Sequence, residues 1–418
     1  MRSPPKPALL MLLILFGALI FGGVSSVQAQ NGGVTFTTGP NLATARMMHA
    51  VTVLADGRAA LFGGHGTDFV PLQSAEIWDP ATNSFTTHQM HFTHDTCAIA
   101  RLNDGRYLLA GGFSDPLGVG YTTTAEVFDP TSANFTPTGA MHYARAEAAA
   151  ATLTGGQVLV VGSWYEPTAG LYGDLYDPAA NTFTATKQLN TGRSHPRVLP
   201  TADGKAVVCG GMDVYGGSTI EQVELYDPAL NSFSILQANL LPGEPGWVTG
   251  GSVDWNNGIA IEAQKLPDGR YLFLASNINT STYSLFTFDP ATKSFAKFAT
   301  APALPSSGVG LLTPVVDAGR NKAYLLAFVT PYPSMPVQAR VYTANLTSGA
   351  LSAPTGATPL NGYLGNVGLN LLVDGRLFVT GGNTAFGPSN YNFSPAKLTF
   401  FGSLASKSAI SAMMMLID

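Results

Sequence analysis

Residues 55–86 read ADGRAALFGGHGTDFVPLQSAEIWDPATNSFT, and the order of turns and apolar runs in this stretch decides the fold. An Asp-Gly-Arg triplet comes first, then an apolar run ending in two glycines, then a second run ending in Asp-Pro. An Asp-Gly pair between apolar runs predicts a β-hairpin whose two central residues both adopt a positive φ, and proline ends a strand because it cannot donate to the sheet. The stretch therefore predicts short antiparallel strands joined by tight turns.

Both signals return along the chain. The triplet and its apolar run recur at 103–112, 202–211 and 373–382, with weaker copies at 154–163 and 267–276. The Asp-Pro segment recurs at 124–136, 173–184, 223–234 and 285–296, with a degenerate copy at 339–352. A fixed period of about 50 residues indicates a repeat fold. Each repeat reads as four strands, and four-stranded sheets arranged around an axis leave only short, protected edges.

The Asp-Gly-Arg triplet, the paired glycines, the aromatic residue before Asp-Pro and the aromatic residue in the fourth strand resemble the kelch motif over residues 34–402. The resemblance is to kelch-repeat β-propellers, especially the secreted bacterial type, and to the central propeller of galactose-oxidase-like proteins. It implies an all-β fold, and it is specific for the fold rather than for a function.

The two ends of the chain favour seven blades over six. The seventh repeat has its first two strands near 366–382 and its third at 397–401, but no fourth strand follows. Residues 34–46, VTFTTGPNLATAR, resemble the junction after the fourth strand of other repeats. We therefore expect an all-β, seven-bladed β-propeller of four-stranded antiparallel blades, with the last blade closed by the N-terminal strand.

Residues 1–29 have the pattern of a secretory signal peptide, with Arg2 and Lys6 before an apolar run at 9–22 and small residues before Gln30. The run is shorter than the roughly 20 residues of a membrane span, so we expect none after signal removal. The predicted product is exported, either secreted or periplasmic, with the propeller at 30–402 and an unassigned tail at 403–418.

Composition narrows the class of protein further. Charged residues make up only 11% of the chain, and its 46 glycines and 28 prolines favour turns over long helices. The net charge of −5 gives no basic surface for nucleic acid, so nucleic acid is not an expected partner. Cys97 and Cys209 lie in apolar runs of different repeats, and we expect both to be free buried thiols.

The connections of a repeat divide between two faces. The Asp-Gly-Arg and Asp-Pro turns are uniform, whereas the loops from the second to the third strand and the junctions between repeats vary. Loops that vary between repeats are not needed to build the blades, so the face that carries them is the one expected to bind a ligand. Aromatic residues in these loops can stack on sugars or anchor a peptide, or they simply cover the blades. They are Phe69, Tyr121, Trp164, Tyr165, Tyr215, Tyr332, Phe386 and Tyr391.

The first four junctions each carry a basic residue twelve residues before the end of the turn triplet. These residues are Arg46, His94, Arg145 and Arg193. We expect them near the mouth of the central channel, and the kelch resemblance implies an anion-binding role there, since arginines at this part of the motif line acidic-peptide pockets. Guanidinium groups bind carboxylates in a bidentate manner. The alternative is that each arginine bonds loop carbonyls within its own blade.

The junction between the fourth and fifth repeats is longer than the others, by about fifteen residues within 238–258. The segment contains Glu244, Trp247, Asp254 and Trp255. Long insertions are more often functional than structural, so we expect a ligand contact from Trp247 and Trp255. The alternative is a lid or a packing insert.

No catalytic motif is present in the sequence. The seven histidines form no pair suited to galactose-oxidase copper, and no phosphate loop, nucleophile elbow or zinc spacing occurs, so we expect no metal or cofactor. The leading hypothesis is a non-catalytic module that binds a protein or glycan. Its candidate ligand-binding residues are Arg46, His94, Arg145, Arg193, Trp164, Tyr165, Tyr215, Trp247 and Trp255.

An enzymatic alternative is a small anionic-sugar isomerase, similar to sialic-acid epimerases built on kelch propellers. It needs a carboxylate beside an arginine at the channel mouth for general acid and base work. Arg46, Arg145 and Arg193 would supply the cation, and no motif selects among the carboxylates. The candidates are Glu147, Glu166, Glu221, Glu244 and Glu262.

Overall fold

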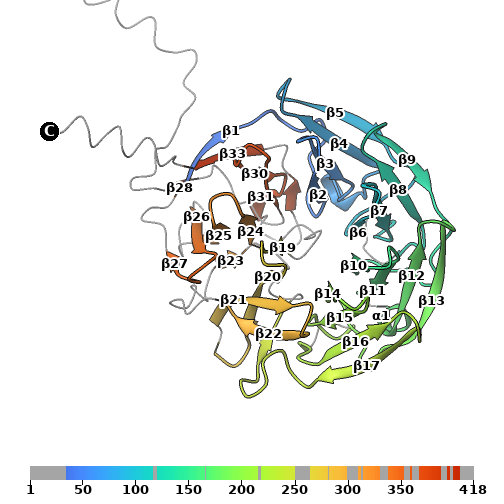
Figure 1. Cartoon of the computed structure of the whole chain (residues 1–418). Helices are drawn as coiled ribbons and strands as arrows, with labels where there is room; N and C mark the ends of the chain where they lie inside the picture. Colours follow the sequence, from blue (N-terminus) through green and yellow to red (C-terminus); the bar gives the residue numbers. More distant parts are fainter. Residues whose placement is uncertain are drawn as a thin grey trace, which may run out of the picture.

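The structure is a computed structural model, and it describes residues 34–404 with internal gaps. The gaps are 116–119, 165, 215–217, 250–263, 281, 299–308, 312–313, 330–337, 353–357, 360–366, 387–392 and 396–398. Seven antiparallel blades follow one another around a ring, with the first strand of each blade nearest the centre (Figure 1). The predicted signal peptide and residues 405–418 lie outside the described residues.

Blades 1 to 4 are regular four-stranded meanders. Blade 1 contains β2 (Ala50–Val53), β3 (Ala59–Phe62), β4 (Ser74–Asp79) and β5 (Ser84–Gln89). Blade 2 contains β6 (Ala98–Arg101), β7 (Tyr107–Ala110), β8 (Ala125–Asp129) and β9 (Asn134–Pro137). Blade 3 contains β10 (Ala149–Thr152), β11 (Val158–Val161), β12 (Tyr172–Asp177) and β13 (Thr182–Gln188). Blade 4 contains β14 (Arg197–Pro200), β15 (Ala206–Cys209), β16 (Val223–Asp227) and β17 (Ser232–Gln237).

Two short helices, η1 (Thr67–Phe69) and α1 (Pro167–Leu171), lie in the loops between the second and third strands of blades 1 and 3. No helix among the described residues is long and apolar enough to cross a membrane.

Blades 5 and 6 each have a divided first strand. Blade 5 contains β18 (Trp247–Val248), β19 (Gln264–Lys265), β20 (Tyr271–Asn277), β21 (Thr282–Asp289) and β22 (Ser294–Lys297). Blade 6 contains β23 (Val309–Leu311), β24 (Val315–Asp317), β25 (Lys322–Val329), β26 (Gln338–Asn345), β27 (Leu351–Ser352) and β28 (Thr358–Pro359). Because β18 and β19 both pair with β20, the longer connection predicted at 238–258 interrupts the innermost strand of blade 5.

Blade 7 is closed by the N-terminal strand, as the sequence predicts. It contains β29 (Gly368–Leu371), β30 (Leu377–Thr380), β33 (Thr399–Leu404) and β1 (Val34–Thr38), and a separate hairpin is formed by β31 (Asn383–Phe386) and β32 (Phe393–Pro395). β1 runs antiparallel to β33, with Val34 opposite Leu404 and Thr38 opposite Phe400 (Figure 1). β33 thus reaches two residues beyond the predicted domain boundary at 402.

Apolar side chains pack between neighbouring blades rather than within them. One cluster of buried apolar residues lies at each interface of the described ring, including the interface of blade 7 with blade 1. At that closing interface, Trp78 stacks on Phe378 with ring centroids 5.3 Å apart. Cys97 and Cys209 lie in such clusters as buried free thiols, which confirms the prediction, and burial raises the pKa of Cys209 to about 12.

The paired glycines allow neighbouring blades to touch. The N–H of Gly64 donates to the carbonyl of His94 at 2.9 Å, and the N–H of Gly382 closes the ring on the carbonyl of Arg46 at 3.1 Å. A Cβ at Gly63 would lie 1.9 Å from the His94 carbonyl oxygen, so no larger residue fits without displacing the backbone. The glycine pair is therefore a backbone contact between blades.

The Asp-Gly-Arg turn differs in detail from its predicted form. Gly57 has a φ of +90°, but Asp56 is not among the described residues with positive φ. The N–H of Gly57 bonds to the carbonyl of Leu54 at 3.0 Å, and the N–H of Leu54 bonds to the carbonyl of Arg58 at 2.8 Å. This is the three-residue hairpin loop with one left-handed residue. Asp56 instead accepts hydrogen bonds from the backbone and side chain of Arg58, which explains the third residue of the triplet.

Candidate functional site at the inner ends of blades 1 to 4

The basic residue of each of the first four junctions is completely buried inside its own blade. In blade 4, Nη2 of Arg193 lies 2.7 Å from Oε1 of Glu224, and Nη1 donates to the carbonyls of Gly210 and Gln222. Glu224 also accepts the backbone N–H groups of Asn190 and Thr191 from the same junction. We use the name junction clamp for this unit. It consists of the buried basic residue, the carboxylate of the third strand that faces it, and the junction backbone that bonds to that carboxylate.

Equivalent clamps join Arg46 to Glu76 at 2.8 Å and Arg145 to Asp174 at 2.7 Å. Burial lowers the pKa of Arg46 and Arg145, and the charge of the facing carboxylate opposes that shift. Buried ions of this kind persist only when they are paired and hydrogen-bonded. The clamp therefore supplies each buried guanidinium with the counter-charge it requires.

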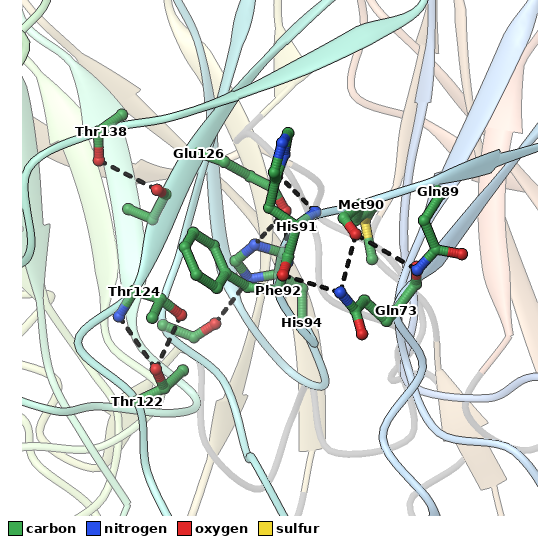
Figure 2. Close-up of polar contacts among 12 residues, drawn as sticks. Gln73, Gln89, Met90, His91, Phe92, His94, Thr122, Thr124, Glu126 and Thr138 are labelled. Atoms are coloured by element: carbon green, nitrogen blue, oxygen red, sulfur yellow. Dashed lines mark hydrogen bonds and ion pairs between the residues drawn. The ribbon is translucent and has the colours of Figure 1, made fainter.

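Blade 2 carries histidine in place of arginine (Figure 2). Figure 2 shows Glu126 between His94 and the junction residues His91 and Phe92. Nε2 of His94 lies 3.0 Å from Oε1 of Glu126, and Nδ1 lies 2.9 Å from the Gly111 carbonyl oxygen. Burial opposes ionisation of Glu126, but the bonds from His94 and His91 outweigh it and lower the pKa of Glu126 below its ordinary value.

These clamps correct the predicted position of the four basic residues. Arg46, His94, Arg145 and Arg193 have no exposed surface, so they do not line the channel mouth. The guanidinium groups bond carboxylates and carbonyls of their own blades, which is the alternative that the sequence left open. A basic residue that recurs at one position of the repeat thus stabilises the blade.

The second residue after each clamp base has an unusual backbone. Met48, Thr96, Glu147 and His195 have φ values of +52°, +53°, +56° and +48°, although none is glycine. The N–H of Glu147 donates to the carbonyl of Thr96, and the N–H of His195 donates to the carbonyl of Glu147, both at 3.0 Å. We call these four residues the inner belt. A left-handed conformation costs a non-glycine residue roughly 1–2 kcal/mol, so each member is held in place by its surroundings.

Two imidazole–carboxylate pairs lie at the inner ends of these blades. Nδ1 of His65, after β3, lies 2.9 Å from Oδ2 of Asp95, which precedes β6. Nε2 of His195 lies 2.9 Å from Oε2 of Glu147, within ion-pair distance, although the angle does not make a hydrogen bond. His65 and Asp95 are each 4% exposed. Each pair therefore joins two adjacent blades.

Several polar atoms of these pairs are buried without a hydrogen-bond partner among the described residues. They are Nε2 of His65, Oδ1 of Asp95, Oε2 of Glu147 and Nδ1 of His195. Burial raises the pKa of Asp95, the bond from His65 opposes the rise, and the charge of Glu147 adds to it. Unpartnered buried polar atoms are uncommon in folded proteins, and they call for an explanation at this site.

Aromatic side chains accompany both pairs. The ring of Phe69 lies 5.1 Å from the ring of His65, and the ring of Trp164 lies 5.7 Å from that of His195 in an edge-on arrangement. Trp164 is one of the residues predicted to bind a ligand, and it is half-buried at this place. The predicted residues Tyr165, Tyr215 and Trp255 lie outside the described residues.

Trp247 does not have the exposed position that the sequence predicts. It is 5% exposed and belongs to the apolar cluster between blades 4 and 5, and its ring lies 5.0 Å from Phe286. Its Nε1 donates to Glu244, which pairs with Lys297. Trp247 thus packs in the core between blades 4 and 5, and its predicted ligand contact stays a prediction.

Two of the remaining carboxylates of the enzymatic alternative have structural positions among the described residues. Glu221 accepts the N–H of Gly246, and Glu166 is the N-cap residue of α1. Glu262 lies outside the described residues. Among these candidates, Glu147 alone belongs to an imidazole–carboxylate pair within the described part of the chain.

Sequence reasoning missed His65, Asp95 and His195 as site residues. A signal was available, because Asp95 stands where the other junctions have Met47, Ala146 and Ser194. An alignment of the repeats shows that Asp95 is the one charged residue at this position of the first four junctions, so it departs from the repeat pattern. Differences between repeats indicate function, whereas recurrences indicate structure.

Comparison with known proteins supports the fold. No family model and no curated protein matches the chain. Among solved structures, the chain is similar to a novel fungal alcohol oxidase of the AA5 family in complex with copper, with 15% identity and a TM-score of 0.58. The match covers 90% of this chain and 77% of that chain. At this identity the similarity shows the fold alone, which is that of a seven-bladed β-propeller.

The copper named for that structure does not fit the residues described for this chain. The described residues contain no group of three or more His, Cys, Asp or Glu side chains that could hold a metal ion. His65 and His195 each face a carboxylate instead, and both cysteines are buried in apolar clusters.

Proposed function

We propose that this propeller is an exported binding module that holds a protein or glycan ligand at the inner ends of blades 1 to 4. The observation that carries the proposal is the partly exposed aromatic ring, Phe69 or Trp164, that lies beside each of the two imidazole–carboxylate pairs. The sequence pattern of residues 1–29 supports export.

The energetic cost of this arrangement supports a ligand-binding role. A buried polar group without a partner costs about 1–3 kcal/mol. Glu147 and His195 also hold left-handed backbone conformations. Strained backbone and unpartnered polar atoms gather at ligand sites because the fold holds the groups ready for a partner.

The enzymatic alternative retains one specific observation. Glu147 is paired with an imidazole, which is the arrangement of a general base. Its proposed partners Arg46, Arg145 and Arg193 are enclosed in junction clamps, which disfavours an anionic substrate. NMR spectra of neutral and anionic sugars incubated with the chain test this alternative, and unchanged spectra across the panel would eliminate it.

The binding proposal is tested with two matched variants, screened against an array of glycans and a peptide library. Trp164→Ala removes the ring beside His195, and Ile235→Ala removes an exposed apolar side chain on the outer strand β17. The native chain is expected to bind, with binding lost in Trp164→Ala and retained in Ile235→Ala. Absence of any ligand, or equal binding by the two variants, would refute the proposal.

A further inference from the structure

We propose that His94 makes the contact between blades 2 and 3 sensitive to pH, because the protonated ring holds the peptide bond between Gly111 and Gly112 and the neutral ring releases it. This contact is made of hydrogen bonds among the described residues, so its behaviour is independent of any ligand. Histidine is the side chain whose charge ordinarily changes between about pH 5 and 8, whereas arginine keeps its charge there.

In the first four blades, each clamp base holds a peptide bond that also touches the next blade. In blade 1, Nη1 of Arg46 donates to the Gly63 carbonyl at 2.8 Å. The N–H of Gly64 donates to the His94 carbonyl at 2.9 Å. Because the C=O of Gly63 and the N–H of Gly64 belong to one planar unit, a base that fixes the carbonyl also orients the N–H that reaches the next blade.

Blades 3 and 4 repeat this arrangement with arginine. Arg145 donates to the Gly162 carbonyl at 3.0 Å. Arg193 donates to the Gly210 carbonyl at 3.2 Å. The residue after each glycine then donates to the following blade. Guanidinium groups stay protonated across the physiological range, so these contacts do not change with pH.

Blade 2 holds the equivalent peptide bond with an imidazole. Nδ1 of His94 lies 2.9 Å from the Gly111 carbonyl oxygen, and Nε2 lies 3.0 Å from Oε1 of Glu126. The N–H of Gly112 donates to the Arg145 carbonyl in blade 3 at 2.8 Å. A protonated ring has two N–H groups and bonds both acceptors, whereas a neutral ring has one and must give up one acceptor.

The bond to Gly111 is the one expected to be lost when the ring is neutral. Glu126 also accepts the backbone N–H groups of His91 and Phe92, as an ionised carboxylate does (Figure 2). Hydrogen bonds to ionised acceptors are roughly twice as strong as neutral ones, so the remaining N–H stays with Glu126. Nδ1 then turns a lone pair toward the Gly111 carbonyl oxygen. The peptide contact is therefore present at low pH and lost as the pH rises.

Other titratable groups surround the His94 ring. His91 bonds the second oxygen of Glu126, and Asp95, the next residue in the chain, pairs with His65. Burial raises the pKa of Cys97, so this thiol stays neutral. The neighbouring clamps and the second imidazole–carboxylate pair add further groups, which are Arg46, Glu76, Arg145, Asp174, Glu147 and His195. A test has to separate His94 from the imidazoles of His65 and His91.

Backbone hydrogen exchange of the native chain and of His94→Arg, measured from about pH 6 to about pH 9, tests the inference. Dividing the native rate by the variant rate at each pH removes the pH dependence that all amides share. We expect this ratio to rise about tenfold at Gly112, because the charge-assisted bond that holds its peptide is lost in the native chain alone. At Gly64 and Gly211, whose peptides are held by arginine, the ratio is expected to stay constant. A constant ratio at Gly112, or an equal rise at all three amides, would overturn the inference.

Two control variants remove the other imidazoles. His91→Asn copies blade 4, where the side chain of Asn190 bonds Glu224 at 2.9 Å in the equivalent place. His65→Asn removes the ring that pairs with the neighbouring carboxylate. Both variants are expected to keep the rise in exchange at Gly112. A rise that disappears in either variant would assign the pH dependence to the wrong histidine and would also overturn the inference.

The NMR signals of the His94 ring in the native chain give a second measurement, which does not require any variant to fold. We expect both ring nitrogens to carry hydrogen at about pH 6 and only one of them at about pH 9. A ring that has one N–H at both pH values, or two at both, would contradict the inference.

Discussion

The Nε2 atom of His94 lies 3.0 Å from Oε1 of Glu126, and its Nδ1 atom lies 2.9 Å from the carbonyl oxygen of Gly111. A carboxylate and a carbonyl both accept hydrogen bonds, so the imidazolium form of the ring would satisfy both partners at once. It occupies the place that guanidinium groups hold in blades 1, 3 and 4. Blade 2 therefore has the same clamp with a different cation.

This equivalence predicts unequal effects of two substitutions. His94→Arg restores the cation of the other blades and is expected to leave the free energy of unfolding within about 1 kcal/mol of native, whereas His94→Leu leaves Glu126 buried without its cation and is expected to cost about 3–5 kcal/mol. Urea unfolding measures both values. Equal destabilisation by the two substitutions would contradict the account of the clamp.

The clamp of blade 2 also predicts a dependence of stability on acid. The pKa of Glu126 is lowered from its ordinary 4.5, so the folded chain binds this proton less tightly than the unfolded chain. The stability it contributes is present above pH 4.5 and is lost as the pH falls through the folded pKa. The difference in unfolding free energy between the native chain and Glu126→Gln should therefore shrink on acidification below pH 4.5. A difference that stays constant would refute this assignment.

Glycine substitutions separate two requirements of the turns, which are a positive φ and the absence of a Cβ where another backbone lies close. Gly155 has open space around a Cβ, Gly105 has open space but a φ of +91°, and Gly63 combines a φ of +57° with the His94 carbonyl 1.9 Å from a Cβ. Replacement by alanine should be nearly neutral at Gly155, cost about 1 kcal/mol at Gly105, and cost several times more at Gly63. Thermal unfolding ranks the three variants, and any other order contradicts the role of the paired glycines.

The sequence predicts this fold well because the motifs that recur are the ones that build the blades. The aromatic residue before Asp-Pro shows the reason: the hydroxyl of Tyr176 donates to Asn181, and Trp78 donates to Asn83 in the equivalent turn. The Asp-Gly turn was predicted in place but not in form, since pairing of Asp56 with Arg58 favours the longer loop.

The site was harder to predict from sequence, because the candidate residues were chosen for their charge or aromatic ring, and neither property shows whether a side chain is exposed. Arginines at one position of the repeat looked like a cluster, but a recurring buried ion pair satisfies each blade separately. Trp247 looked like part of a binding insert, but it lies on the innermost strand of blade 5, where its ring packs between blades. Only three-dimensional contact shows that Asp95 meets His65 from the preceding blade.

The Asp95–His65 pair predicts a conflict between stability and binding. Burial raises the pKa of Asp95 above its ordinary 3.8, so the folded chain favours the protonated carboxyl and loses stability as the pH rises through the folded pKa. Asparagine stays neutral at every pH and still accepts from His65. Asp95→Asn is therefore expected to melt at a higher temperature than the native chain at neutral pH while binding more weakly. A lower melting temperature would contradict the assigned cost of this carboxylate.

Histidine-selective NMR tests the central claim most directly, because the chain has only seven histidines. Single substitutions assign the imidazole signals, and the tightest-binding ligand from the glycan and peptide screen is then added to the labelled chain. We predict shifts at His65 and His195, whose rings carry unpartnered nitrogens at the inner ends of the blades, and no shift at His88 on the outer strand. Saturation of binding with His65 and His195 unshifted would contradict the account.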